Sequence, residues 1–166
     1  MSENILVSII TVVYNGEKHL EQTINSVLSQ SYKNIEYIII DGGSTDSTLS
    51  IIKRYEDKIS YWLSEPDTGI YNAMNKGIKL CTGDYVAFLN SDDWYNIDTV
   101  QAMVDEIVKS NADYVFANVS NYYKDELCFV FKPNLDKYHR YIPFGHPALY
   151  LKREILLSMG FDERYK

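Results

Sequence analysis

Short runs of β-branched and aromatic residues alternate along this chain with longer segments in which apolar residues recur every three or four positions. The runs are typical of buried strands, and the spacing is typical of helices with one covered face. Strands are predicted at residues 6–13, 35–40, 59–63, 85–89, 114–119 and 148–151. Helices are predicted at residues 17–29, 47–55, 70–81, 100–108 and 153–159. Strand, helix and strand in this order predict parallel crossover units.

The later part of the chain departs from this alternation. Residues 121–132 alternate loosely, and their polar centre at 124–126 is suited to the turn of a hairpin. Residues 133–147 have the composition of a long loop. We therefore expect one α/β domain over residues 1–166, with a mostly parallel central sheet, helices on both faces and a late antiparallel addition.

The composition limits the binding partners and the cellular compartment that we expect for this protein. The 166 residues suffice for a sizeable core, and the formal charge of -7 with no basic stripe argues against binding to nucleic acid. The two cysteines, Cys81 and Cys128, lack the spacing of a zinc or redox site, so we expect a reduced, cytoplasmic setting. No apolar run approaches the ~20 residues of a membrane span. A peripheral contact with a membrane surface remains an alternative.

An acidic pair follows the predicted strand at 85–89. Asp92 and Asp93 come directly after Asn90 and Ser91, and ligands of open α/β sheets bind in the crevice beyond the carboxyl ends of the strands. Two adjacent carboxylates there are oxygen ligands suited to a hard divalent cation, which would in turn hold phosphate oxygens. A helix N-cap or an ordinary turn is the competing interpretation. The pair therefore predicts either a metal site or an ordinary helix cap or turn.

Four segments in order make the chain resemble the family 2 glycosyltransferases, inverting enzymes of the Rossmann-related GT-A fold. They are residues 7–15, 40–46, 67–77 and 90–93, and a weaker fifth block is 145–147 with 160–164. The resemblance implies transfer of a sugar from a nucleotide-diphosphate sugar, first of all a UDP-sugar, to a hydroxyl of a glycan or lipid-linked acceptor. It further implies Mg²⁺ or Mn²⁺ as cofactor and a role in bacterial surface polysaccharide or glycolipid synthesis.

The resemblance also implies site residues. Nucleotide contacts fall on Thr11, Tyr14, Asn15, Asp41, Asn75, Lys76 and Asp92, with Glu17 as a weaker candidate for the ribose. Asp41 matches the acid that accepts a hydrogen bond from the base, a charge-assisted bond worth ~1.5 to 3 kcal/mol. The competing interpretations are a packed ring for Tyr14, a turn aspartate for Asp41 and a solvated lysine for Lys76.

The metal is assigned to Asp93 first and Asp92 second, and the common family pattern has a further aspartate where this chain has Asn90. Many members have an arginine where this chain has Met74. His146 matches a loop that meets the acceptor or the diphosphate, although a lone histidine is also a common structural hydrogen-bonder.

The general base of the resembling enzymes, an aspartate or glutamate, follows the segment that matches residues 160–163 here. The sequence stops at Lys166, so we expect the base and the C-terminal part of the family domain to lie beyond it, and this chain to bind a nucleotide but turn over poorly. A noncatalytic nucleotide- or glycan-binding module of the same fold is the alternative. A sugar-phosphate nucleotidyltransferase is disfavoured, because no glycine-rich phosphate loop is found near the N-terminus.

Overall fold

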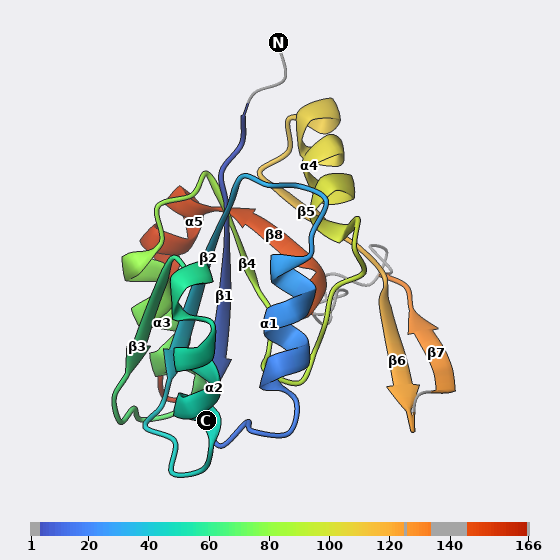
Figure 1. Cartoon of the computed structure of the whole chain (residues 1–166). Helices are drawn as coiled ribbons and strands as arrows, with labels where there is room; N and C mark the ends of the chain where they lie inside the picture. Colours follow the sequence, from blue (N-terminus) through green and yellow to red (C-terminus); the bar gives the residue numbers. More distant parts are fainter. Residues whose placement is uncertain (1–3, 125, 134–145, 166) are drawn as a thin grey trace.

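The protein, seen here in a computed structural model that describes residues 4–124, 126–133 and 146–165, is built around a six-stranded sheet of order β3-β2-β1-β4-β8-β5 (Figure 1). The parallel strands are β1 (Val7–Val13), β2 (Ile35–Asp41), β3 (Tyr61–Ser64) and β4 (Tyr85–Phe88). The late strand β8 (Leu149–Lys152) runs antiparallel to both its neighbours, β4 and β5 (Tyr114–Phe116). The predicted mostly parallel sheet with a late antiparallel addition is confirmed.

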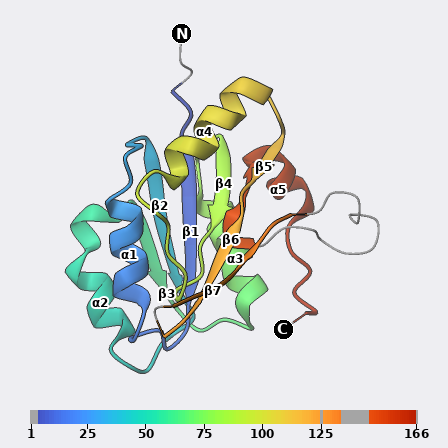
Figure 2. The same ribbon diagram turned by 90° about the vertical axis from the view of Figure 1, so that its right-hand side faces the viewer.

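Helices cover both faces of this sheet (Figure 2). One face carries α1 (Leu20–Leu28), α2 (Thr48–Arg54), which a short 3-10 turn η1 (Glu56–Lys58) follows, and α4 (Thr99–Ser110). The other face carries α3 (Ile70–Leu80) and α5 (Arg153–Met159). Successive side chains of a strand point to opposite faces. Ile9 of β1 therefore packs on the α1 side and Ile10 on the α3 side, and all seven residues of β1 are buried.

The close packing of α3 on β1 depends on a glycine. A Cβ atom at Gly77 would lie 2.6 Å from the Cγ2 atom of the fully buried Ile10. Any larger residue would push the helix from the sheet. The sequence therefore uses Gly77 to let the helix and the strand meet.

A network of hydrogen bonds joins the N-terminal end of β1 to β2 and to the turn before β4. The buried Ser8 hydroxyl donates to Glu36 Oε2 (2.5 Å) and accepts from the Gly83 N–H (2.9 Å). The backbone N–H and hydroxyl of Thr82 also donate to Glu36, at 2.8 and 2.7 Å. Burial alone would raise the pKa of Glu36, but these hydrogen bonds outweigh it and lower that pKa below its usual 4.5. Glu36 is thus held as a structural carboxylate.

The predicted hairpin forms a separate two-stranded antiparallel sheet of β6 (Val119–Tyr123) and β7 (Glu126–Phe131), which stands to one side of the main sheet in Figure 1. The single strand predicted at 114–119 is instead divided between β5 and β6. The strand predicted at 148–151 is preceded by a 3-10 turn, η3 (His146–Ala148). His139 and Arg140 of the predicted loop lie outside the described residues.

Within the part of the chain that the structure describes, no helix combines the length and the apolar character needed to cross a bilayer.

Candidate functional site

A cavity opens at the point where the strand order of the sheet reverses. The chain proceeds from β1 outward to β2 and β3, and then returns to the opposite side of β1 as β4. Connections after β1 and β4 therefore diverge, which leaves a crevice at their carboxyl ends. A cavity of about 600 Å³ lies there, lined by the segment after β1, the start of α3 and the segment after β4.

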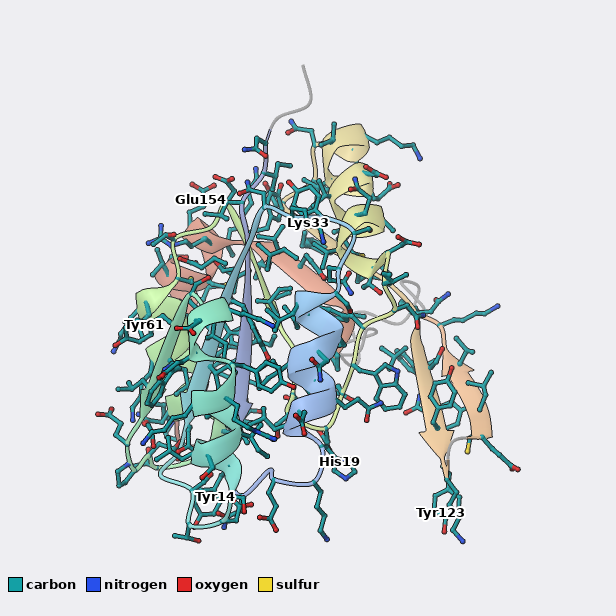
Figure 3. The ribbon with its side chains drawn as sticks, in the orientation of Figure 1. Tyr14, His19, Lys33, Tyr61, Tyr123 and Glu154 are labelled. Atoms are coloured by element: carbon teal, nitrogen blue, oxygen red, sulfur yellow. The ribbon has the colours of Figure 1, made fainter. Side chains whose placement is uncertain are left out.

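Tyr14 and His19 stand on the β1 side of this cavity and are both labelled in Figure 3. Tyr14 is 64% exposed, so its ring is free to meet a ligand. His19 immediately precedes α1. His19 was not predicted as a site residue, because a single histidine in a polar turn carries no periodic signal. Its position shortly after the first strand is the one clue in the sequence.

The loop after β1 is fastened to the loop after β2. The Asn15 N–H donates to Ser44 Oγ (2.8 Å), and Asn15 Oδ1 accepts from the Thr45 N–H (2.9 Å). Asn15 adopts a left-handed backbone with φ of 52°. Glu17 accepts from the Ser47 N–H (3.0 Å). Both side chains, predicted as nucleotide contacts, are thus engaged in holding one wall of the site in place.

Asp41 and Thr11 lie below the cavity surface and do not line it. Asp41 is fully buried, and its carboxylate accepts from the Ser44 hydroxyl (2.5 Å) and the Ser64 hydroxyl (2.6 Å). A ligand N–H would have to compete with these two hydroxyls for it. Thr11 is also fully buried, with its hydroxyl 3.1 Å from the Tyr37 hydroxyl. The structure therefore gives both residues partners within the protein.

Asn75 and Lys76 are likewise placed outside the cavity lining. Asn75 Nδ2 donates to the carbonyl oxygen of Phe161 (2.9 Å), and Asn75 Oδ1 accepts from the N–H of Phe161 (2.8 Å). Lys76 pairs with Glu65 at 2.8 Å. Residues of α3 advance by about 100° each, so the helix presents Ile70 to the cavity and turns these two side chains away.

The acidic pair is divided between two cavities. Asp92 is exposed and lines the 600 Å³ cavity, whereas the half-buried Asp93 lines a smaller one of about 120 Å³. The Thr23 hydroxyl holds the loop that carries them, because its one hydrogen is shared between the carbonyl oxygens of Ser91 (2.9 Å) and Asp93 (2.8 Å). The helix-cap interpretation is wrong, because α4 begins only at Thr99. The alternative of an ordinary turn is confirmed, because Ser91 and Asp92 form a turn in which the Asp93 N–H donates to the carbonyl oxygen of Asn90 (3.1 Å).

The charge of Asp93 lacks a cationic partner among the described residues. Burial raises the pKa of its carboxyl, the nearby charge of Asp92 raises it further, and a hydrogen bond from Asn90 Nδ2 (3.2 Å) lowers it in part. Desolvation and a like charge both favour loss of the negative charge. A cation bound beside the pair would relieve this cost.

The pair fits a divalent cation that a ligand helps to hold. No cluster of three or more histidine, cysteine or acidic side chains with metal-binding geometry occurs within residues 4–124, 126–133 and 146–165. Mg²⁺ is usually held by one or two carboxylates together with substrate phosphates rather than by a complete protein cage. Asp92 and Asp93 supply two adjacent carboxylates of this kind. The turn that begins at His146 brings Pro147 and Ala148 into the lining of the cavity beside Asp93.

Comparison with known proteins identifies the family and the fold of this chain. The sequence model of glycosyl transferase family 2 matches residues 8–154. The α/β fold is that of GT-A glycosyltransferases, and the chain belongs to glycosyl transferase family 2. It is 33% identical over 135 residues to the glycosyltransferase GlyA of Streptococcus pneumoniae, covering 80% of this chain and 19% of GlyA. It is 36% identical over 118 residues to the putative teichuronic acid biosynthesis glycosyltransferase TuaG of Bacillus subtilis, covering 69% of this chain and 47% of TuaG.

Solved structures show the same fold. The S. aureus TarS 1-349 structure in complex with UDP matches with a TM-score of 0.83 and 24% identity, over 98% of this chain and 52% of that one. The mannosyltransferase PcManGT from Pyrobaculum calidifontis, in complex with GDP-Man and Mn²⁺, matches with a TM-score of 0.74 and 22% identity, over 96% of this chain and 48% of that one. The chain thus spans about half or less of the length of these relatives.

Proposed function

We propose that this chain binds a nucleotide-diphosphate sugar in the 600 Å³ cavity and transfers the sugar, with inversion, to an acceptor hydroxyl. The observation that carries the proposal is the acidic pair, which lies at the switch point of a family 2 sheet without a cationic partner among the described residues. A UDP-sugar is the first donor to test, because the TarS structure that this chain resembles holds UDP.

Mg²⁺ or Mn²⁺ would be held by Asp93 and Asp92, as the complex of PcManGT with Mn²⁺ supports. When bound, such a cation neutralises negative charge on the departing diphosphate. Asp93 is kept in place for this role by Thr23 and Asn90. Since the protein carries a formal charge of -7, a diphosphate would be repelled without that cation.

The remaining residues share the binding of the nucleotide. Tyr14 offers an exposed ring against which a base stacks, and the exposed Asp92 faces the ribose from the same cavity. Asp41 is proposed to accept a hydrogen bond from an N–H group of the base. That bond would replace one of the two bonds that Asp41 accepts from serine hydroxyls. Asn75 and Lys76 act indirectly, because they anchor the segments at 161–163 and 65–66 beside the site.

The acceptor is proposed to be a glycan or lipid-linked glycan of a surface polysaccharide, in line with the name of the relative TuaG. Inversion also needs a carboxylate that takes the proton of the acceptor hydroxyl as it attacks. We assign that base to none of the described residues. His146 stays a proposed contact to the acceptor or the diphosphate, since its turn adjoins the cavity beside Asp93.

Calorimetric titration with UDP, GDP and dTDP, each with manganese and with a chelator, tests this proposal. We expect one diphosphate to bind only with manganese, and Asp93→Asn to weaken that binding more than about tenfold, as losses at metal sites commonly do. Asp105→Asn, an exposed α4 carboxylate remote from the cavity, is the matched control and should bind normally. Metal-independent binding, or equal binding by both variants, would refute the metal role of Asp93.

A further inference from the structure

Helix α1 presents a stripe of polar side chains to the acidic loop, residues 90–98, which leads from β4 to α4. Thr23 and Ser26 belong to α1, and Gln30 follows the end of that helix. We call these three residues the α1 stripe. Thr23 and Gln30 are each only 1% exposed. Since a buried polar group costs free energy unless it is hydrogen-bonded, the α1 stripe needs partners in the interior.

The partners of the α1 stripe are backbone groups of the acidic loop, which runs beside α1 in Figure 1. Thr23 binds carbonyl oxygens at the start of this loop. The Ser26 hydroxyl accepts from the Tyr95 N–H (3.2 Å). Gln30 Nε2 donates to the carbonyl oxygen of Asn96 (2.8 Å). The acidic loop is thus bound to α1 at successive points along its length.

Gln30 also completes the start of α4. Its Oε1 atom accepts from the N–H of Val100 (3.0 Å), in the first turn of that helix. The first N–H groups of a helix have no partner within the helix. The side chain of the N-cap residue, Asp98, makes no capping bond within the described part of the chain. Gln30 therefore supplies, from α1, a cap that the acidic loop does not supply itself.

The acidic loop needs such support because it has little regular structure of its own. Residues 91–92 form a turn, and residues 93–96 are neither helix nor strand. Asp92 and Asp93 carry like charges on adjacent residues, and like charges repel. A free loop would relieve that repulsion by turning one carboxylate away from the other. Backbone bonds to α1 oppose such a movement, and a site that is already ordered loses less entropy when it binds a ligand.

We propose that Gln30 and Ser26 act with Thr23 as positioning residues, so that α1 fixes the backbone from which Asp92 and Asp93 meet a divalent cation. This inference rests on the proposed function, which assigns the cation to that pair. Neither Gln30 nor Ser26 occurs among the described residues that line the two cavities. Their effect on the cation therefore passes through the backbone of the acidic loop.

The test follows manganese binding in the presence of UDP by electron paramagnetic resonance, at a temperature at which every variant is folded. Gln30→Met keeps the length of the side chain and removes its hydrogen-bonding groups. Ser26→Ala is a milder second variant, which loses the bond to the Tyr95 N–H. Thr23→Val removes the third member of the stripe at nearly constant shape, and Thr23→Ser restores its hydroxyl.

Two controls separate positioning from a general loss of stability. Gln22→Met repeats the glutamine substitution at an exposed position of α1. Ser8→Ala removes a buried hydroxyl at the far end of β1, where it is bonded to Glu36 and Gly83. It therefore costs stability without touching the acidic loop.

We expect Gln30→Met and Thr23→Val to need roughly tenfold more manganese for half-saturation, as the loss of groups that orient metal ligands commonly does. Ser26→Ala should need roughly fivefold more, the effect of one lost hydrogen bond. Thr23→Ser, Gln22→Met and Ser8→Ala should bind manganese as the native chain does. Excess manganese should restore UDP binding to every weakened variant, because the nucleotide contacts are intact. In the metal-free chain, the Val100 amide should exchange its hydrogen faster in Gln30→Met.

Native manganese binding by both Gln30→Met and Ser26→Ala, or an equal loss in Ser8→Ala, would overturn the inference. The proposed donor site would still hold in that case, provided that the native chain binds UDP only with manganese. If the native chain itself binds no manganese with UDP, the proposed function fails and this inference fails with it.

Discussion

The two sides of the acidic pair are built differently. On the side of the 600 Å³ cavity, the loops after β1 and β2 are fastened to one another by hydrogen bonds of Asn15 and Glu17, above a strand that is buried on both faces. On the other side, the hairpin of β6 and β7 forms a sheet of its own and leaves Leu127 (55%) and Phe129 (58%) exposed.

This difference indicates which part of the molecule has to be rigid. Rigid groups bind with less loss of conformational entropy, so the fastened loops suit a donor whose diphosphate must be held in one pose. A hairpin outside the main sheet can change its sequence without disturbing the core. The hairpin is thus the part of this architecture whose sequence is most free to vary.

The largest effect should come from the packing of α3 on β1. Gly77→Val would drive its side chain into Ile10, and overpacking of this kind costs about 3 kcal/mol. Urea unfolding measures the loss. Lys79→Val, at an exposed position of the same helix, is the control and should change stability by less than about 1 kcal/mol. Equal losses for the two would show that α3 is not tightly packed on the sheet.

A smaller effect is expected where the two loops are fastened. Asn15→Ala loses the bond to Thr45 and also places a Cβ-bearing aliphatic residue at φ of 52°, for a total of about 2 kcal/mol. Asn15→Gly restores the backbone freedom and loses only the side-chain bond, about 1 kcal/mol. Thermal unfolding and UDP titration should both rank the native chain first, the glycine variant second and the alanine variant last. A reversed order of the two variants would show that backbone strain is not involved.

Glu36 should make the stability of the fold depend on pH in the acidic range. Its folded pKa lies below the usual 4.5, so its contribution is present above the unfolded pKa and is lost as the pH falls through the folded pKa. Glu36→Gln should cost about 1 kcal/mol at pH 7 and make the decline in stability below pH 4.5 shallower. The midpoints of urea unfolding, taken at several pH values above and below this point for both proteins, measure the difference. If the native chain and Glu36→Gln differed in free energy of unfolding by the same amount at every pH, the account would be contradicted.

The smallest effect is expected on the hairpin. Phe129→Ser should change the free energy of unfolding by no more than about 0.5 kcal/mol, because the ring is 58% exposed. Val115→Ser, at the one buried position of β5, should cost about 2 kcal/mol. Urea unfolding of the pair compares the hairpin with the sheet. A large loss for Phe129→Ser would mean that the hairpin is part of the cooperative core.

Periodicity was sufficient to predict the sheet and the helices that cover it. Runs such as 35–40 are long, apolar and bounded by turn residues, so local sequence determines them. The strand at 114–119 was less well predicted, because Ala117 and Val119 extend the apolar run past the end of β5 with only Asn118 between them. The chain leaves the sheet there through tertiary packing, which no local pattern records.

The site was predictable in outline but not in its contacts. The acidic pair and Tyr14 could be placed from the order of strands and turns. The partners of Asp41 could not, because Ser64 is 23 positions away and meets it only when β3 pairs with β2. Asn75 is turned toward Phe161 for the same reason, since that contact requires the chain to return over α3.

The most direct test is diffraction at the manganese absorption edge from crystals grown with UDP and Mn²⁺. An anomalous peak about 2 Å from a carboxylate oxygen of Asp93, with the diphosphate on its other side and the base beside Tyr14, is the result that the account predicts. UDP bound in the cavity with no metal at Asp92 or Asp93, or manganese bound elsewhere, would contradict it.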